Sequence, residues 1–142
     1  MDDSFLTNCL FFTSNRLSRI ITKIAEEEFA STGLTPMYGY LVRLVVSAPG
    51  ISQKELSEKL SITPSTLTRF VDKLEGKQLV ERKVNGKTVL VYPTPKGEAL
   101  VGTIREASRR FRERYEAILG TETVRKMTEE HESISSLLEK KP

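Results

Sequence analysis

Apolar side chains recur every three or four residues over much of the chain, which is the spacing of amphipathic helices. The first run predicts one long helix over about residues 4–32, ended by Gly33, because glycine accepts the left-handed conformation that closes many helices. Two later runs, which begin near residues 95 and 121, predict two more helices. The apolar positions of these three helices are Phe5, Cys9, Phe12, Leu17, Ile20, Ile21, Ile24 and Phe29; Ile104, Ala107, Phe111, Tyr115 and Ile118; and Val124, Met127, His131, Ile134 and Leu138.

Three shorter helices are predicted between these long ones from their start signals. Two of them begin with threonine followed by proline, at residues 35–36 and 63–64, and proline fits the first helical position because its missing N–H has no partner there. The third begins at Ser52, which forms the S-x-x-E spacing of a capping box with Glu55. The predicted helices run from Pro36 to a stop at residues 48–50, from Ser52 to Leu60, and over about 64–77.

After residue 79 the pattern changes to strand-forming residues, which predict a two-stranded hairpin that ends near Tyr92. Asn85-Gly86 separates the two runs, and Asn-Gly is a strong hairpin signal because a type I′ turn needs positive φ at both central residues. We therefore predict that Asn85 and Gly86 form the turn, with Lys87 at the tip. The strand formers are Val80, Val84, Val89, Leu90 and Val91.

The helices over 52–60 and 64–77 predict a helix-turn-helix, because only Ser61-Ile62 separates them. In this motif the second helix enters the DNA major groove. Its exposed face is rich in hydroxyl and basic groups, which suit base edges and phosphates, and Arg69 is long enough to reach a guanine edge. The predicted DNA-binding residues are Ser65, Thr66, Thr68, Arg69 and Lys73 on this helix, and Arg82, Lys83 and Lys87 on the hairpin.

The distribution of charge supports double-stranded DNA as the partner more than the net charge of +3 does. Residues 51–97 carry nine basic and five acidic residues, a balance of +4, whereas residues 1–50 sum to −1 and residues 98–142 to zero. A localised basic surface is what binding to the phosphate backbone requires. The arginines between residues 105 and 114 are interleaved with glutamates, which favours ion pairs on a solvated helix over a second basic surface.

These elements predict a mainly α (α+β) fold in which a winged helix-turn-helix lobe carries a two-stranded β wing. The length of 142 residues suits a single domain over 1–142, with the lobe over 34–97 and flanking helices over 4–32 and 98–140. The apolar stripes of the flanking helices exceed what one small lobe covers, and a symmetric dimer is the commonest way to bury them. We therefore expect a homodimer in which these are the dimerisation helices.

Five segments between Gly33 and Gly97 carry a resemblance to a known family: residues 33–36 (GLTP), 52–60 (SQKELSEKL), 63–75 (TPSTLTRFVDKLE), 79–83 (LVERK) and 94–97 (TPKG). With these segments the stretch resembles the MarR family of bacterial transcriptional regulators, and the flanking helices fit the same architecture. The resemblance implies a homodimer whose terminal helices interdigitate and whose two lobes bind palindromic DNA. It also implies a small-molecule effector, bound between the dimer domain and the DNA lobe, that weakens DNA binding.

The chain departs from the family's pattern at two positions. The family's wing usually carries Asp-x-Arg where this shorter wing has Asn85-Gly86-Lys87, so the arginine's role passes to Lys87. Because lysine lacks the planar fork of arginine, we expect weaker reading of the minor groove. The second departure is Ser61, which stands in the turn where glycine is common and so leaves the backbone angles of that turn open.

Cys9 and His131 are the only residues of their types, so neither an internal disulfide nor a metal cluster is expected, and no cofactor is expected either. Redox sensing at Cys9 would need partners that stabilise a thiolate, whereas residues 10–12 are apolar, which favours a buried small hydrophobe and leaves sensing as the alternative. His131 falls on the apolar stripe of the last helix, which favours an interface histidine over a pH sensor.

We expect a DNA-binding transcriptional regulator, with repression favoured over activation, that binds a pseudo-palindromic operator. An enzyme is not expected, because no nucleophile–base pair, glycine-rich phosphate loop or carboxylate constellation stands out. A winged helix that binds protein instead of DNA would present an apolar or acidic face on residues 64–77, and this face is hydroxylic and basic. The chain shows neither a long apolar segment nor a signal-peptide pattern, so a cytoplasmic location without membrane contact is expected.

Overall fold

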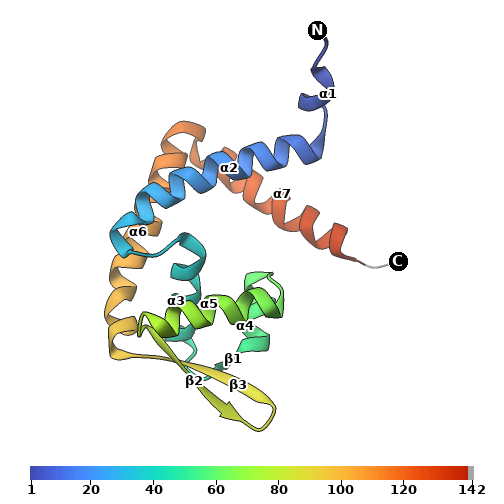
Figure 1. The fold of residues 1–142 in the computed structure, drawn as a ribbon. Helices are drawn as coiled ribbons and strands as arrows, with labels where there is room; N and C mark the ends of the chain where they lie inside the picture. Colours follow the sequence, from blue (N-terminus) through green and yellow to red (C-terminus); the bar gives the residue numbers. More distant parts are fainter. Residues whose placement is uncertain (141–142) are drawn as a thin grey trace. The chain divides into compact units, whose positions relative to one another are not determined.

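The computed structural model describes residues 1–140, so residues 141–142 of the predicted domain lie outside the described residues. The chain forms two compact units, residues 1–108 and the residues from Arg109 onward, with the boundary inside α6. No helix within residues 1–140 is both long and apolar enough to cross a membrane. The elements are α1 (Ser4–Thr7), α2 (Leu10–Phe29), the 3-10 helix η1 (Ala30–Thr32), α3 (Pro36–Ser47), β1 (Ile51–Ser52), α4 (Gln53–Leu60), α5 (Pro64–Gly76), β2 (Val80–Asn85), β3 (Thr88–Pro93), α6 (Pro95–Leu119) and α7 (Thr121–Glu139) (Figure 1).

The segment predicted as one helix over 4–32 is divided, so its predicted continuity is wrong. Asn8 and Cys9 separate α1 from α2, and Cys9 has an extended backbone with φ −105° and ψ 119°. Asparagine favours helix ends because its side chain competes for backbone hydrogen bonds, and the Cys9 carbonyl accepts the N–H of Thr13 at 3.0 Å to begin α2. The predicted end is confirmed, because Gly33 is left-handed with φ 72°.

The short helices begin where their signals predict. Thr35 precedes α3 without a side-chain cap, and Pro36 is the first helical residue. The starts of α4, α5 and the long helix α6 are capped by hydroxyl oxygens that accept a backbone N–H three residues further along the chain. Each bond satisfies one of the unpaired donors of the first turn. These bonds join Ser52 to Glu55 at 3.1 Å, Thr63 to Thr66 at 3.2 Å and Thr94 to Gly97 at 3.0 Å.

The core of residues 1–108 is formed by the apolar faces of the helices and of the sheet. Gly39 allows α2, α3 and α6 to approach closely, because a Cβ atom there would lie 3.0 Å from the Phe29 ring and 3.4 Å from a methyl of Ile104. Burying each large aliphatic or aromatic side chain stabilises the fold by about 1.5–3 kcal/mol. The largest fully buried side chains are Phe29, Leu41, Leu56, Leu67, Leu74, Ile104, Val42, Val45, Val71, Val80 and Val91.

The predicted two-stranded wing is present as β2 and β3, and the short strand β1 joins it in an antiparallel sheet of order β1-β3-β2. Strand β1 was not predicted from the sequence, because its two residues carry no alternating pattern of their own. Because Ser52 both ends β1 and caps α4, the sheet fixes the point at which the helix-turn-helix begins.

The predicted turn at Asn85-Gly86 is wrong by one position. Asn85 pairs with Thr88, so the two loop residues are Gly86 and Lys87. Gly86 has φ 65°, whereas within residues 1–140 the non-glycine residues at positive φ are Ser61 and Gln78. Positive φ at the first central residue alone is the pattern of a type II′ turn, which matches strand twist as well as type I′ does. Lys87 is therefore at the tip, as predicted.

The second unit contains the end of α6 and α7, separated by Gly120 with φ 85°. The interleaved charges at the end of α6 pair within the helix as expected, Arg109 with Glu113 and Arg112 with Glu116. In α7 the Arg125 guanidinium binds Glu122 at 2.5 Å, and this hydrogen bond lowers the pKa of the Glu122 carboxyl. These exposed pairs are local to their helices.

Candidate nucleic-acid interface

The helix α5 presents the predicted polar face to solvent. Leu67, Val71 and Leu74 are fully buried beneath it. Helical periodicity then places Thr68, Arg69, Asp72 and Lys73 on the outer face, which is where a DNA groove would be met. Of the predicted contact residues on α5, Ser65, Thr68, Arg69 and Lys73 are exposed and Thr66 is half-buried.

The first turn of α5 carries a cluster of hydroxyl groups that organise one another. Thr63 donates its hydroxyl to that of Thr66 at 2.9 Å and lies 3.3 Å from the hydroxyl of Ser65. The Arg69 guanidinium donates to the Thr66 hydroxyl at 3.3 Å, and the Thr68 hydroxyl donates to the Pro64 carbonyl at 3.0 Å. This long hydrogen bond holds the Arg69 side chain only weakly near the start of α5. Because the side chain is exposed, it can bind another acceptor in place of Thr66.

Two of the predicted basic residues lie over tyrosine rings. The Lys73 ammonium is 5.6 Å from the ring centroid of Tyr38, and the Lys83 ammonium is 4.7 Å from that of Tyr92. Cation–π contacts of this kind restrict the side chain while leaving the charge at the surface. Neither tyrosine could be identified as a partner from the sequence, because its approach to the lysine is a tertiary contact.

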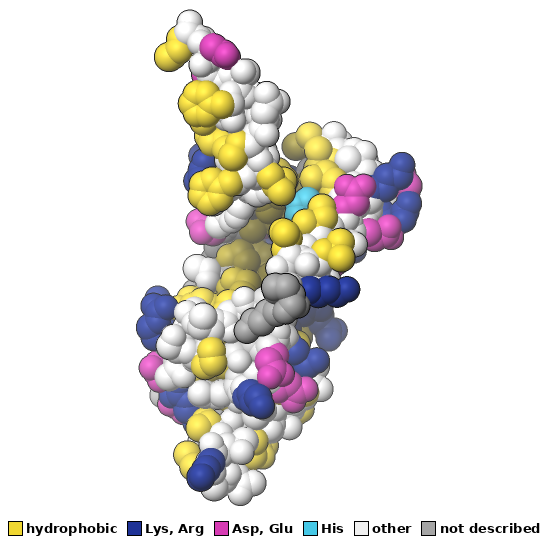
Figure 2. Space-filling model, turned by 90° about the vertical axis from the view of Figure 1, so that its right-hand side faces the viewer, with side chains coloured by type: hydrophobic (Ala, Val, Ile, Leu, Met, Phe, Trp, Pro, Cys, Tyr) yellow, Lys and Arg dark blue, Asp and Glu magenta, His cyan; other side chains and the backbone are white. Residues whose placement is uncertain are grey.

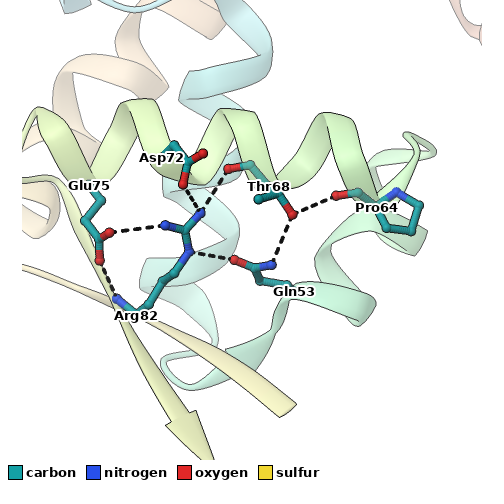
Figure 3. Close-up of polar contacts among 6 residues, drawn as sticks. All are labelled: Gln53, Pro64, Thr68, Asp72, Glu75 and Arg82. Carbon is teal, nitrogen blue, oxygen red and sulfur yellow. Dashed lines mark hydrogen bonds and ion pairs between the residues drawn. The ribbon is translucent and has the colours of Figure 1, made fainter. Parts of the chain in front are cut away.

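Arg82 lies inside the lobe, where it joins β2 to both helices of the helix-turn-helix (Figure 3). Its guanidinium donates to the side-chain oxygen of Gln53 in α4 at 2.8 Å and to the Thr68 carbonyl in α5 at 2.9 Å. It also pairs with Asp72 at 2.7 Å and with Glu75 at 3.2 Å. The side chain is only 21% exposed, so these four partners hold it in place.

The neighbouring basic residues of β2 therefore have different surroundings. Successive side chains in a strand point to opposite faces, which places Arg82 on the side of α5 and Lys83 on the side of Tyr92. The contact of Arg82 with DNA stays a prediction, and its donors are engaged within the lobe. No signal in the sequence distinguishes the two residues, because the difference depends on which face of the wing packs on α5.

A groove of about 580 Å³ separates the starts of α4 and α5 from the tip of the wing. Three of the lining residues are among those predicted from the sequence, Ser52 as a helix cap and Thr68 and Lys87 as DNA contacts. Gln53 and Lys54 are not among them, although both follow the predicted cap at Ser52 and so occupy the first turn of α4. The groove is lined by Ser52, Gln53, Lys54, Pro64, Thr68, Lys87, Thr88 and Val89.

Cys9 and His131 belong neither to the helix-turn-helix nor to the wing. Cys9 is half-buried before α2, and His131 is exposed on α7 with its Nδ1 atom 2.6 Å from the Met127 carbonyl oxygen. Within residues 1–140 no three histidine, cysteine or carboxylate side chains are grouped so that they could hold a metal ion.

A family model matches part of the DNA-binding lobe, and a known relative matches most of the chain. The MarR family model matches residues 39–85, which extend from α3 to the end of β2. An uncharacterized HTH-type transcriptional regulator of Bacillus subtilis (strain 168), YybA, is 31% identical over 126 residues, which are 86% of this chain and 79% of the relative. The relation therefore includes the flanking helices as well as the lobe.

Solved structures share the fold at lower identity. The repressor CouR of Rhodococcus jostii RHA1, solved on a 23-mer DNA duplex, is 21% identical with a TM-score of 0.85 and covers 95% of this chain and 98% of its own. The regulator PcaV of Streptomyces coelicolor, solved with its natural ligand, is 17% identical with a TM-score of 0.84 and covers 94% and 96%. At these identities the two structures show a common winged-helix fold.

Proposed function

This chain belongs to the MarR family of DNA-binding transcriptional regulators, and from that premise we propose that it is a repressor that binds a pseudo-palindromic operator as a homodimer. The family acts by binding DNA and not by catalysis, so the chain is not an enzyme. The observation that carries the proposal is the exposed hydroxylic and basic face of α5 beside a wing with a lysine at its tip.

In the proposed complex α5 is the recognition helix and lies in the major groove, while the wing reaches the adjacent minor groove or its backbone. Arg69 reads a base edge, because its exposed guanidinium projects from the second turn of the helix. Lys73, Lys83 and Lys87 neutralise phosphates, and Arg82 supports the wing from within the lobe. Ser65, Thr66 and Thr68 complete the contact surface with short hydroxyls that approach base edges or phosphates.

Apolar side chains that each unit leaves exposed support the proposed homodimer. In the N-terminal helices Phe5, Leu10 and Phe11 are 71%, 68% and 78% exposed, and yellow side chains run along this segment at the top of Figure 2. In the second unit Ile118 and Leu138 are 76% and 75% exposed. Soluble monomers rarely expose apolar patches of this extent. We therefore propose that residues 4–32 and 98–140 form the dimer interface and that 34–97 is the DNA-binding lobe of a single domain.

A small-molecule effector is the remaining part of the proposal. CouR and PcaV have been solved with p-coumaroyl-CoA and with a natural ligand, respectively, and both share this fold. A ligand that binds the free protein better than the DNA-bound protein must weaken DNA binding by the ratio of those affinities. We propose that this chain acts in the cytoplasm and is released from its operator by a ligand of this kind.

The test is to select duplexes from a random pool with the purified full-length protein. We expect an enriched sequence with a two-fold axis and half-site centres about 10 bp apart, because a symmetric dimer presents two recognition helices. A doubly substituted Arg69→Ala, Lys87→Ala protein serves as the control, which should enrich the same sequence less strongly and with the preference at one base pair relaxed. Enrichment of an asymmetric half-site, or sedimentation of a folded monomer at micromolar concentration, would contradict the dimeric proposal. Failure of the parent to bind any duplex would favour a winged helix that binds protein.

A further inference from the structure

We propose that the groove between the starts of α4 and α5 and the wing tip holds one sugar–phosphate strand of the DNA, and that Lys54 is a phosphate-binding residue on its wall. This inference rests on the proposed function and deepens it, because it assigns a binding site and a residue that neither the sequence pattern nor the comparisons assign. The ligand is the anionic backbone itself, whatever its bases.

The groove lies where a DNA backbone strand would pass between α5 and the wing. The major and minor grooves of a duplex are separated by a single backbone strand, so a protein that places α5 in one and its wing in the next must leave room for that strand between them. The groove lies in that interval. One wall contains Pro64 and Thr68 of α5, and the opposite wall contains Lys87, Thr88 and Val89 of the wing.

The lining of the groove is positively charged. The eight lining residues include two lysines and no acidic residue, and the two lysines come from different elements, Lys54 from α4 and Lys87 from the wing tip. A phosphate strand between them would face an ammonium group from each side. Pairing a lysine with a phosphate releases a condensed counterion, which supports binding independently of sequence. Lys54 therefore supplies backbone affinity from an element that precedes the recognition helix.

Hydrogen bonds inside the lobe hold the walls of the groove in place. Gln53 and Thr68 line the groove from α4 and α5, and the Gln53 amide donates to the Thr68 hydroxyl at 3.5 Å. Behind them the Arg82 guanidinium binds the Gln53 side-chain oxygen at 2.8 Å and the Thr68 carbonyl at 2.9 Å (Figure 3). This network sets the width of the groove in the free protein. Binding of DNA therefore needs little further ordering of the side chains that line it.

The experiment measures the dissociation constant as a function of salt for the parent, Lys54→Ala and Lys59→Ala, each on the selected operator and on a scrambled duplex. Lys59 is the matched control, because it is an exposed lysine of the same helix that does not line the groove. Five residues along a helix also turn it by about 140° away from Lys54.

We expect Lys54→Ala to lower the slope of log affinity against log salt by about one, and to weaken operator and scrambled duplex alike. Lys59→Ala should keep the parent slope, and Lys54→Arg should restore it, because a phosphate contact needs only a reachable positive charge. If the parent binds with a steep salt slope and Lys54→Ala keeps that slope, the groove proposal is overturned while the proposed function stands. If the parent binds no duplex, both are overturned.

Discussion

The carboxylate of Glu75 binds Arg82 twice, through one oxygen to the backbone and through the other to the side chain. Its Oε2 atom accepts the Arg82 backbone N–H at 3.0 Å, and its Oε1 atom accepts the guanidinium at 3.2 Å. Because Glu75 lies in the last turn of α5 and Arg82 in β2, this pair fixes the wing to the recognition helix. The major-groove and minor-groove contacts of the proposed complex are therefore mechanically linked.

The first prediction concerns this link. Glu75→Gln has nearly the same shape but only one acceptor oxygen and no charge, so one of the two bonds is lost. Hydrogen bonds to charged groups contribute about 1.5–3 kcal/mol, and partial exposure reduces that value. We expect a loss of about 1 kcal/mol in the free energy of unfolding, measured by urea denaturation.

The same variant should bind the operator more weakly while keeping the salt slope of the parent, because no phosphate contact is removed. Glu81→Gln is the matched control, since Glu81 is an exposed acid of the same strand, and its stability should change by less than about 0.5 kcal/mol. Equal effects of the two substitutions would show that the link has no mechanical role.

The helix starts could be predicted from sequence because their signals are local. Ser52 and Thr63 form the expected bonds to backbone N–H groups three residues away, and such bonds need no knowledge of the rest of the fold. The position of the Arg82 side chain could not be predicted in this way. It depends on the packing of β2 against α4 and α5, which brings residues seven to 29 positions apart in sequence into contact.

The register of the wing was missed for a related reason. A turn at residues 85–86 would pair Val84 with Lys87, whereas the structure pairs Val84 with Val89. Both turns have two residues and use Gly86, so the turn signal alone does not choose between them. The choice is made by the strands, because a pair of β-branched side chains stabilises a hairpin more than valine opposite lysine does.

The second prediction concerns the start of α6. A Cβ atom at Gly97 would lie 2.1 Å from the Leu79 carbonyl oxygen, which is a backbone atom and cannot rotate away. Gly97→Ala must therefore displace α6 from the start of the wing, and overpacking of this kind destabilises by about 1–3 kcal/mol. Gly102→Ala is the control in the same helix, because nothing lies within 4 Å of its Cβ position. Thermal unfolding should show a lower Tm for Gly97→Ala and a higher one for Gly102→Ala, since alanine favours helix by about 1 kcal/mol. Equal shifts would contradict the close approach.

The third prediction concerns the turn between α4 and α5. Ser61 is left-handed, with φ 53° and ψ 44°, which explains why glycine is common at this position of the motif. The left-handed conformation costs a non-glycine residue about 1–2 kcal/mol. Glycine removes this strain but loses more entropy on folding. We expect Ser61→Gly to raise the free energy of unfolding by about 0.5–1 kcal/mol and Ser61→Val to lower it, measured by denaturation. A stabilising valine would exclude a left-handed residue here.

The fourth prediction separates the two loop residues of the wing. Gly86 is at φ 65° with nothing within 4 Å of its Cβ position, so Gly86→Val meets strain in the backbone and no clash. A β-branched residue is especially disfavoured at positive φ. We therefore expect Gly86→Val to change the direction of the loop and to cause a modest loss of stability.

Lys87→Ala should leave stability unchanged and weaken operator and scrambled duplex alike, because a lysine on phosphate reads little sequence. Fluorescence anisotropy on both duplexes checks this. Parental affinity of Lys87→Ala at low salt would mean that the wing tip does not touch DNA.

The fifth prediction distinguishes Arg69 from Lys73, which lie one helical turn apart on α5. Arg69→Ala removes a bidentate donor from the base edges and should reduce operator affinity by about 1–3 kcal/mol while relaxing the preference at one base pair. Lys73→Ala removes a point charge held over Tyr38, so it should weaken all sequences alike and lower the salt slope by about one.

Arg69→Lys is the informative third variant, because it keeps the charge and loses the planar fork. Binding is measured on the operator, on single-base variants of it and on a scrambled duplex, over a range of salt. Arg69→Lys should then keep the salt slope of the parent and lose the base preference. If Arg69→Lys keeps the preference, or if Arg69→Ala and Lys73→Ala weaken every duplex to the same extent, base reading belongs to another residue of the α5 face.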